Sequence, residues 1–129
     1  MTRIKHSAIR SSPFQRLFHS EDILLKWSDL SECISTDGKL SKELKENVRR
    51  VLAYGNGCAY CQAKGRPDDI KESYAVAFAE VFLLEREKTE QTFIDVLKEA
   101  FSDEEISELL AFICFTTAQQ YFGALMDLK

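Results

Sequence analysis

Apolar residues recur at steps of three and four along most of the chain, which is the spacing of one face of an α-helix. Only five glycines and two prolines interrupt this pattern in 129 residues, and runs of β-branched residues are few. The pattern therefore predicts an all-α fold of about six helices. A chain of this length is expected to form one domain, 1–129, with residues 1–11 as an N-terminal tail.

Serine residues mark where several predicted helices begin, because a serine hydroxyl accepts a hydrogen bond from an amide of the first turn. These positions are Ser12, Ser20, Ser41 and Ser102. Ser12 stands before Pro13, which suits a first helical turn and opens a short helix through Phe18. That helix is either separate from the one that starts at Ser20 or continuous with it.

The middle of the chain is divided by glycine and proline. Gly55-Asn56-Gly57 is predicted to end the third helix, because glycine adopts the left-handed backbone angles common after a helix. A short helix over 58–64 follows, then a longer one over 68–88 and another over 89–101. The inward faces of the last two are predicted to be Ile70, Tyr74, Ala77, Phe78, Val81 and Phe82 in one, and Phe93, Val96, Leu97 and Phe101 in the other.

The last predicted helix begins at a capping box, Ser102 with Glu105 three residues later, and extends to Leu125. Apolar residues lie on more than one of its faces: Leu109, Leu110, Phe112, Ile113, Phe115, Tyr121, Phe122 and Leu125. So wide an apolar surface in a small protein predicts a homo-oligomer. The alternative is a central helix that the protomer's own helices cover.

Composition narrows the classes of partner. The net charge of −4 and the scattered Lys and Arg residues argue against nucleic acid or an anionic membrane as the partner. No apolar run approaches the roughly 20 residues of a membrane span, and the N-terminus lacks the apolar core of a signal peptide. The cytoplasm is therefore the expected location.

The cysteines carry the candidate chemistry. Cys58 and Cys61 are one helical turn apart just after Gly55-Asn56-Gly57, so their sulfur atoms can form a short disulfide if this segment is helical. A cysteine at a helix start also lies near unpaired amides, which favour the reactive thiolate. Cys33 and Cys114 lie in helical patterns among apolar neighbours and are predicted to be buried, inert thiols.

Leu40 to Lys64 resembles the alkylhydroperoxidase (AhpD)-like and carboxymuconolactone decarboxylase family. The shared features are a capped helix at Leu40-Ser41, Glu46 twelve residues before the first cysteine, and Asn56-Gly57-Cys58 followed by Tyr60-Cys61. Phe78-Ala79-Glu80 and the run from Phe101 to Ile106 are also similar. The resemblance covers about residues 12 to 127. It implies an all-α fold, trimers or hexamers, and reduction of peroxides or disulfides.

The resemblance also implies roles for individual residues. Cys61 would be the attacking thiolate, Cys58 the resolving cysteine and Glu46 the carboxylate of a proton relay. The family's relay histidine falls at Gly65 here, so the relay is incomplete. His19 is a possible replacement, although a surface position ahead of a helix is its more ordinary interpretation.

Two further residues near the cysteines are auxiliary candidates. Tyr60 could donate a hydrogen bond to a thiolate or simply fill a gap in the core. Lys64 could lower a thiol pKa through its charge. The position of Glu46 two residues after Leu44 favours an exposed side chain, whereas burial beside the thiols would raise its pKa and make it a proton acceptor near neutral pH.

The sequence-based prediction is therefore a thiol–disulfide oxidoreductase of the AhpD-like type that reduces a peroxide or a disulfide carrier. No metal and no cofactor are expected, since four zinc ligands at a suitable spacing and a Gly-rich phosphate loop are both missing from the sequence. A non-catalytic redox-sensing or structural oligomer and a lactone decarboxylase are the alternatives.

Overall fold

A computed structural model describes residues 2–8, 12–56, 70–88 and 90–128. The described residues form five α-helices and no strand, which confirms the predicted all-α class. The helices are α1 Glu21–Ser35, α2 Lys42–Asn56, α3 Ile70–Glu85, α4 Gln91–Leu97 and α5 Asp103–Leu125. Two 3₁₀ turns, η1 Gln15–Leu17 and η2 Arg86–Lys88, precede α1 and follow α3.

Three of the predicted serine caps are confirmed. The hydroxyls of Ser20, Ser41 and Ser102 accept hydrogen bonds from the amides three residues on, and Ser102 forms the complete capping box with Glu105. Ser12 also accepts from the Gln15 amide, at 3.2 Å, but opens only the 3₁₀ turn η1. Phe18 is extended, so this turn is separate from α1.

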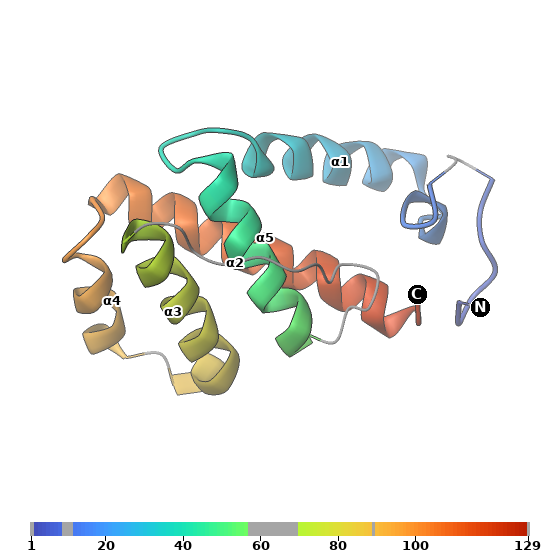
Figure 1. Ribbon diagram of the computed structural model, residues 1–129. Helices are drawn as coiled ribbons and strands as arrows, with labels where there is room; N and C mark the ends of the chain where they lie inside the picture. Colours follow the sequence, from blue (N-terminus) through green and yellow to red (C-terminus); the bar gives the residue numbers. More distant parts are fainter. Residues whose placement is uncertain (1, 9–11, 57–69, 89, 129) are drawn as a thin grey trace.

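The longest helix, α5, runs behind the other elements and makes contacts with both α1 and α2 (Figure 1). Helix α2 also packs on α3, and α4 packs on the outer side of α3. Two contacts give the relative direction of α2 and α3. The Asn47 side chain donates a hydrogen bond to Glu72 near the start of the two helices, and Gly55 lies against the Leu83 side chain near the end of both. The two helices are therefore parallel neighbours.

Parallel packing has a consequence for the chain connection. Residues 57–69 join the end of α2 to the start of α3, and that start lies beside the early turns of α2. A hairpin between antiparallel helices needs only a short loop, whereas parallel neighbours place the end of the first helix away from the start of the second. The predicted cysteine helix belongs to this connection.

The core lies where α2, α3 and α5 meet. Among its buried side chains are Leu44, Val48, Leu52, Ala75, Ala79, Leu109 and Ile113. A second apolar cluster consists of aromatic rings and joins the N-terminal 3₁₀ turn, α1 and the C-terminal half of α5. Its members are Phe14, Phe18, Trp27, Phe115 and Phe122. These two clusters fix α5 as the central helix of the protomer.

The predicted inward face of α3 is partly wrong. Ile70 is 72% exposed and Ala77 is exposed, while Ala75, Val76 and Ala79 are buried instead. The reason is that α3 carries apolar residues on nearly every side, so the periodicity does not select one face. The helix predicted over 89–101 is also shorter, since α4 ends at Leu97.

Gly55 does not end α2. The helix continues to Asn56, and a Cβ atom at Gly55 would stand 2.4 Å from the Leu83 side chain. The glycine therefore allows α2 and α3 to approach closely. Gly57, the other glycine of the predicted breaker, lies outside the described residues.

Candidate functional site

Most of the predicted dithiol site falls outside the described residues: Cys58, Tyr60, Cys61, Lys64 and Gly65. The described chain fixes its two ends. Helix α2 ends at Asn56, two residues before Cys58, and α3 begins at Ile70. The groups on α2 and α3 that flank this segment are therefore the described surroundings of the site.

Glu46 lies in the second turn of α2 and is held by two arginines of the same helix. Arg49 Nε lies 2.9 and 3.0 Å from its two carboxylate oxygens, and Arg50 Nε lies 3.4 Å from one of them. The Glu46 side chain is 41% exposed, so it is neither fully solvated nor buried. Hydrogen bonds from Arg49, together with the charges of both arginines, outweigh partial burial and hold the Glu46 pKa below its ordinary value.

This environment matters for the relay that the family resemblance implies. A carboxylate with a lowered pKa is ionised at neutral pH and is a weak proton acceptor there. Glu46 also precedes the last residue of α2 by ten positions, about 15 Å along the helix axis. Glu46 thus has the features of a charged group that fixes two guanidinium groups.

A buried carboxylate that sequence analysis missed lies nearby. Glu72, in the first turn of α3, is only 4% exposed and accepts a hydrogen bond of 3.1 Å from the Asn47 amide on α2. The sequence did not single it out, because α3 is apolar on nearly every side; in the structure Glu72 shares the buried i, i+3, i+4, i+7 face with Ala75, Val76 and Ala79. A polar residue on a buried helix face must find partners, and this one links α2 to α3.

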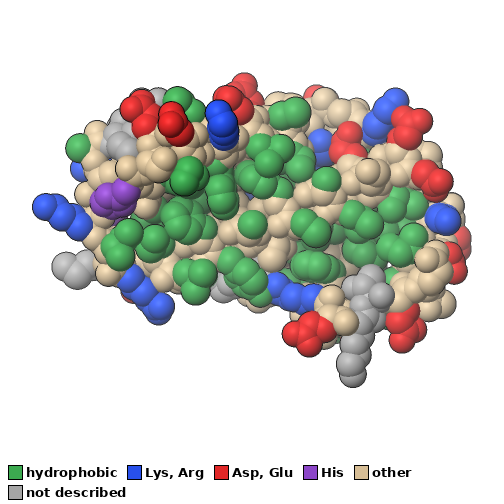
Figure 2. Space-filling model, turned by 180° about the vertical axis from the view of Figure 1, so that it is seen from behind, with side chains coloured by type: hydrophobic (Ala, Val, Ile, Leu, Met, Phe, Trp, Pro, Cys, Tyr) green, Lys and Arg blue, Asp and Glu red, His purple; other side chains and the backbone are tan. Residues whose placement is uncertain are grey.

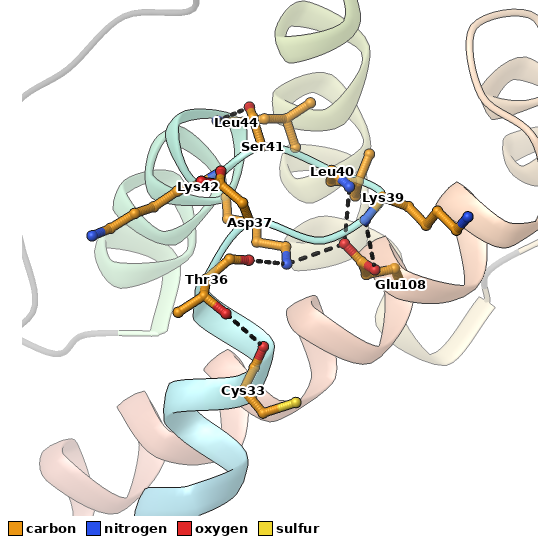
Figure 3. A network of polar contacts seen from close by, with 10 residues as sticks. Cys33, Thr36, Asp37, Lys39, Leu40, Ser41, Lys42, Leu44 and Glu108 are labelled. Carbon is orange, nitrogen blue, oxygen red and sulfur yellow. Dashed lines mark hydrogen bonds and ion pairs between the residues drawn. The ribbon is translucent and has the colours of Figure 1, made fainter.

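A second buried charge cluster links α5 to the α1–α2 loop (Figure 3). Glu108 accepts hydrogen bonds from the backbone amides of Lys39, at 3.1 Å, and Leu40, at 2.9 Å. Lys45 Nζ lies 3.1 Å from the same carboxylate and donates to the Thr36 carbonyl at 2.8 Å. The Lys45 side chain is only 3% exposed.

The Glu108 pKa reflects these contacts. Burial by itself would raise it, but the amides of Leu40 and Lys39 and the ammonium of Lys45 hold it below the ordinary value. All partners of this carboxylate belong to the loop and to the start of α2. We interpret the Glu108 cluster as a structural connection between α1, α2 and α5.

His19 lies in a separate environment. Its side chain is exposed, and its Nε2 lies 2.8 Å from the Lys5 carbonyl in the N-terminal segment. The partners of Glu46 are on α2, so the structure does not join these two predicted relay residues. Trp27 Nε1 donates to Gln119 at 3.1 Å, and Gln120 donates to the Arg49 carbonyl at 3.0 Å, so both α5 glutamines are satisfied within the protomer.

The prediction for Cys33 and Cys114 is wrong. Both are free thiols on the protein surface, on α1 and α5. Each has apolar neighbours in sequence, but those neighbours alternate between the inner and outer sides of their helices. The two thiols occupy the outer sides.

Within the part of the chain that the structure describes, no group of three or more His, Cys, Asp or Glu side chains is arranged to hold a metal ion. None of the described helices combines the length and the apolar character that crossing a bilayer requires. A comparison with models of known protein families gives no match, and a search of curated proteins gives none either.

Proposed function

We propose that the protein is a thiol–disulfide oxidoreductase of the AhpD-like type that reduces a peroxide through Cys58 and Cys61. The observation that carries the proposal is the sequence Asn56-Gly57-Cys58-Ala59-Tyr60-Cys61, with Glu46 twelve residues before the first cysteine. Two thiols separated by two residues can join in a disulfide without a large rearrangement of the chain.

The proposed chemistry balances with two thiols and one peroxide. One cysteine, as thiolate, attacks the O–O bond, becomes a sulfenic acid and releases an alcohol, or water when the substrate is hydrogen peroxide. The second thiol then attacks the sulfenic sulfur, the S–S bond forms and water leaves. An external dithiol reduces the disulfide and returns both cysteines to their starting state.

The environment of the other two cysteines supports this choice of pair. Cys33 and Cys114 lie on two different helices, so they lack the close spacing of a dithiol couple. Position 65, where the family has a histidine, is a glycine, so the proposed thiolate depends on other groups. In our proposal Glu46 is a positioning residue that orients Arg49 and Arg50, and the two thiols carry out the reaction.

The test uses the double variant Cys33→Ser/Cys114→Ser, which removes the two surface thiols and leaves the proposed pair. One equivalent of hydrogen peroxide should remove both remaining thiols together and lower the intact mass by two hydrogen atoms. The pH dependence of alkylation should give one thiol pKa well below the ordinary value of about 8.5. Cys58→Ser and Cys61→Ser in the same background are the matched controls: the variant that keeps the attacking thiol should stop at a sulfenic acid, and the variant that lacks it should react slowly and form no disulfide.

The contrary outcomes are equally specific. If the two thiols are lost independently, or if both alkylate with an ordinary pKa, the cysteine pair has a packing role. The non-catalytic helical protein would then be the better description. Turnover of peroxide with a dithiol reductant in a variant that lacks both Cys58 and Cys61 would also contradict the proposed mechanism.

A further inference from the structure

The outer side of α5 is an uncharged helix face on the protein surface. Residues 109–125 contain no Asp, Glu, Lys, Arg or His. The exposed positions on this stretch are Ala111, Cys114, Ala118, Tyr121 and Leu125, which we call the α5 stripe. Tyr121 is 41% and Leu125 66% exposed. Their spacing of three, four, three and four residues is that of a helix seam that packs on another helix.

The surface around this helix is apolar as well. Figure 2 shows hydrophobic side chains gathered in a broad band across the side of the molecule opposite to that of Figure 1. Asp and Glu side chains are frequent along the right-hand edge of this view, where some Lys and Arg side chains also lie, and side chains of both charges lie at the upper left. A contiguous apolar surface of this kind is typical of an interaction site.

The two ends of α5 carry different exposed charges. Asp103 and Glu104 are exposed at its start, where Glu104 also forms an exposed ion pair of 3.2 Å with Lys39 of the same chain. At its end, the Arg3 amide donates to the Met126 carbonyl at 2.9 Å, which brings the exposed side chains of Arg3 and Lys5 to this region. A parallel copy would bring like charges together, whereas an antiparallel copy brings each acidic end to a basic end.

The side-chain sizes suit the same arrangement. Small residues occupy the first part of the stripe and large residues the last part, so an antiparallel partner can place Tyr121 over the partner's Ala111. Small side chains also permit close approach of the two helix axes. The Tyr121 ring is already held in place, because the Arg86 guanidinium lies 5.0 Å from its centroid.

We propose that the α5 stripe binds the same stripe of a second copy of this chain, antiparallel and related by a two-fold axis. Such a contact is isologous, so each copy supplies both the acidic and the basic end. The proposal concerns assembly and does not rest on the dithiol chemistry.

Light scattering after size-exclusion chromatography in a reducing buffer tests the contact. The wild-type protein should give an even multiple of the 14.8 kDa chain. Ala118→Glu places a charge in the middle of the stripe and should halve the mass of the particle. Ala77→Glu is the matched control, because Ala77 is also an exposed helical alanine but lies on α3, and it should leave the mass unchanged. A wild-type monomer, an odd number of copies, or an Ala118→Glu particle of unchanged mass would overturn the proposal.

Charge reversal tests the direction of the pairing. Glu104→Lys and Arg3→Glu should each weaken the assembly at low salt, by about 5-fold in dissociation constant, a typical effect for an exposed ion pair. The combined variant should recover most of the wild-type affinity. Additive weakening in the combined variant would exclude the antiparallel register, and circular dichroism of each variant separates this result from a loss of fold.

Discussion

Glu46 and Glu108 are two carboxylates with lowered pKa values that the protein holds in different ways. Glu108 is 24% exposed and is bound by backbone amides and a buried ammonium from another part of the chain. Glu46 is 41% exposed and is bound by arginines from its own helix, three and four residues away. A lowered pKa alone therefore does not reveal whether a carboxylate is structural or functional.

The difference lies in what each carboxylate holds together. The Glu108 contacts span about seventy residues of sequence and position the α1–α2 loop on α5, so their loss affects the tertiary structure. The Glu46 contacts are local, form as soon as α2 forms and remain partly solvated. We therefore expect large stability effects at Glu108 and small ones at Glu46.

Glu108→Ala should have the largest effect. It leaves the Lys45 ammonium buried without its carboxylate and removes the acceptor of two backbone amides. Breaking a buried charge pair in this way costs about 3 kcal/mol of unfolding free energy, which urea denaturation measures. Glu104→Ala is the control. Glu104 lies on the same helix as Glu108, and its loss removes only a surface contact with Lys39, which should cost no more than about 0.5 kcal/mol. Equal effects of the two substitutions would contradict the structural role.

Gly38→Ala should have the next largest effect on the free energy of unfolding. A Cβ atom at this position would stand 2.7 Å from the Glu108 carboxylate oxygens, which their hydrogen bonds hold in place. We expect a loss of about 1–2 kcal/mol from the displaced cluster. In the Glu108→Ala background the same substitution should cost almost nothing, because the atoms it collides with are gone. If Gly38→Ala lowers the free energy of unfolding equally in both backgrounds, the loss does not come from a collision with the Glu108 carboxylate.

The contrast between local and distant contacts also explains how much the sequence predicted. Ser20, Ser41 and Ser102 act on amides three residues away, so their caps could be predicted from adjacent residues. The Glu108 cluster joins residues far apart in the chain, and no local pattern indicates it. No local pattern indicates the parallel packing of α2 and α3 either, because the side chains that meet there belong to different helices.

In the candidate site too, features that depend on adjacent residues could be predicted and features that depend on packing could not. The spacing of Glu46, Cys58 and Cys61 is a sequence property and could be stated in advance, whereas the arginine partners that lower the Glu46 pKa required the helix geometry. The exposure of Cys33 and Cys114 was predicted wrongly, because an apolar residue next to a cysteine in sequence, such as Ile113 next to Cys114, can be buried while the cysteine itself is exposed. Burial depends on packing between helices, which a single helical pattern does not specify.

The charge of Glu108 should also make the stability of the protein depend on pH. Its pKa in the folded state lies below the ordinary value of 4.5, so the folded protein binds this proton more weakly than the unfolded chain does. The stabilisation is therefore complete above about pH 5 and is lost as the pH falls below 4.5 through the folded-state pKa. The stability difference between wild type and Glu108→Gln, from urea unfolding, should shrink between pH 6 and pH 3. A difference that grows on acidification would contradict the sign of the shift.

Glu46→Gln should have the smallest effect on stability, about 0.5 kcal/mol or less, because partly solvated pairs three and four residues apart on one helix contribute little. Glu43→Gln, an exposed carboxylate one turn earlier on α2, is the matched control. The alkylation rate of the Cys58/Cys61 pair distinguishes a positioning role from a proton-accepting role for Glu46. If Glu46 only orients Arg49 and Arg50, Glu46→Gln should change that rate by a similar factor at every pH. A loss at neutral pH that higher pH restores would instead identify Glu46 as the base, despite its arginine partners.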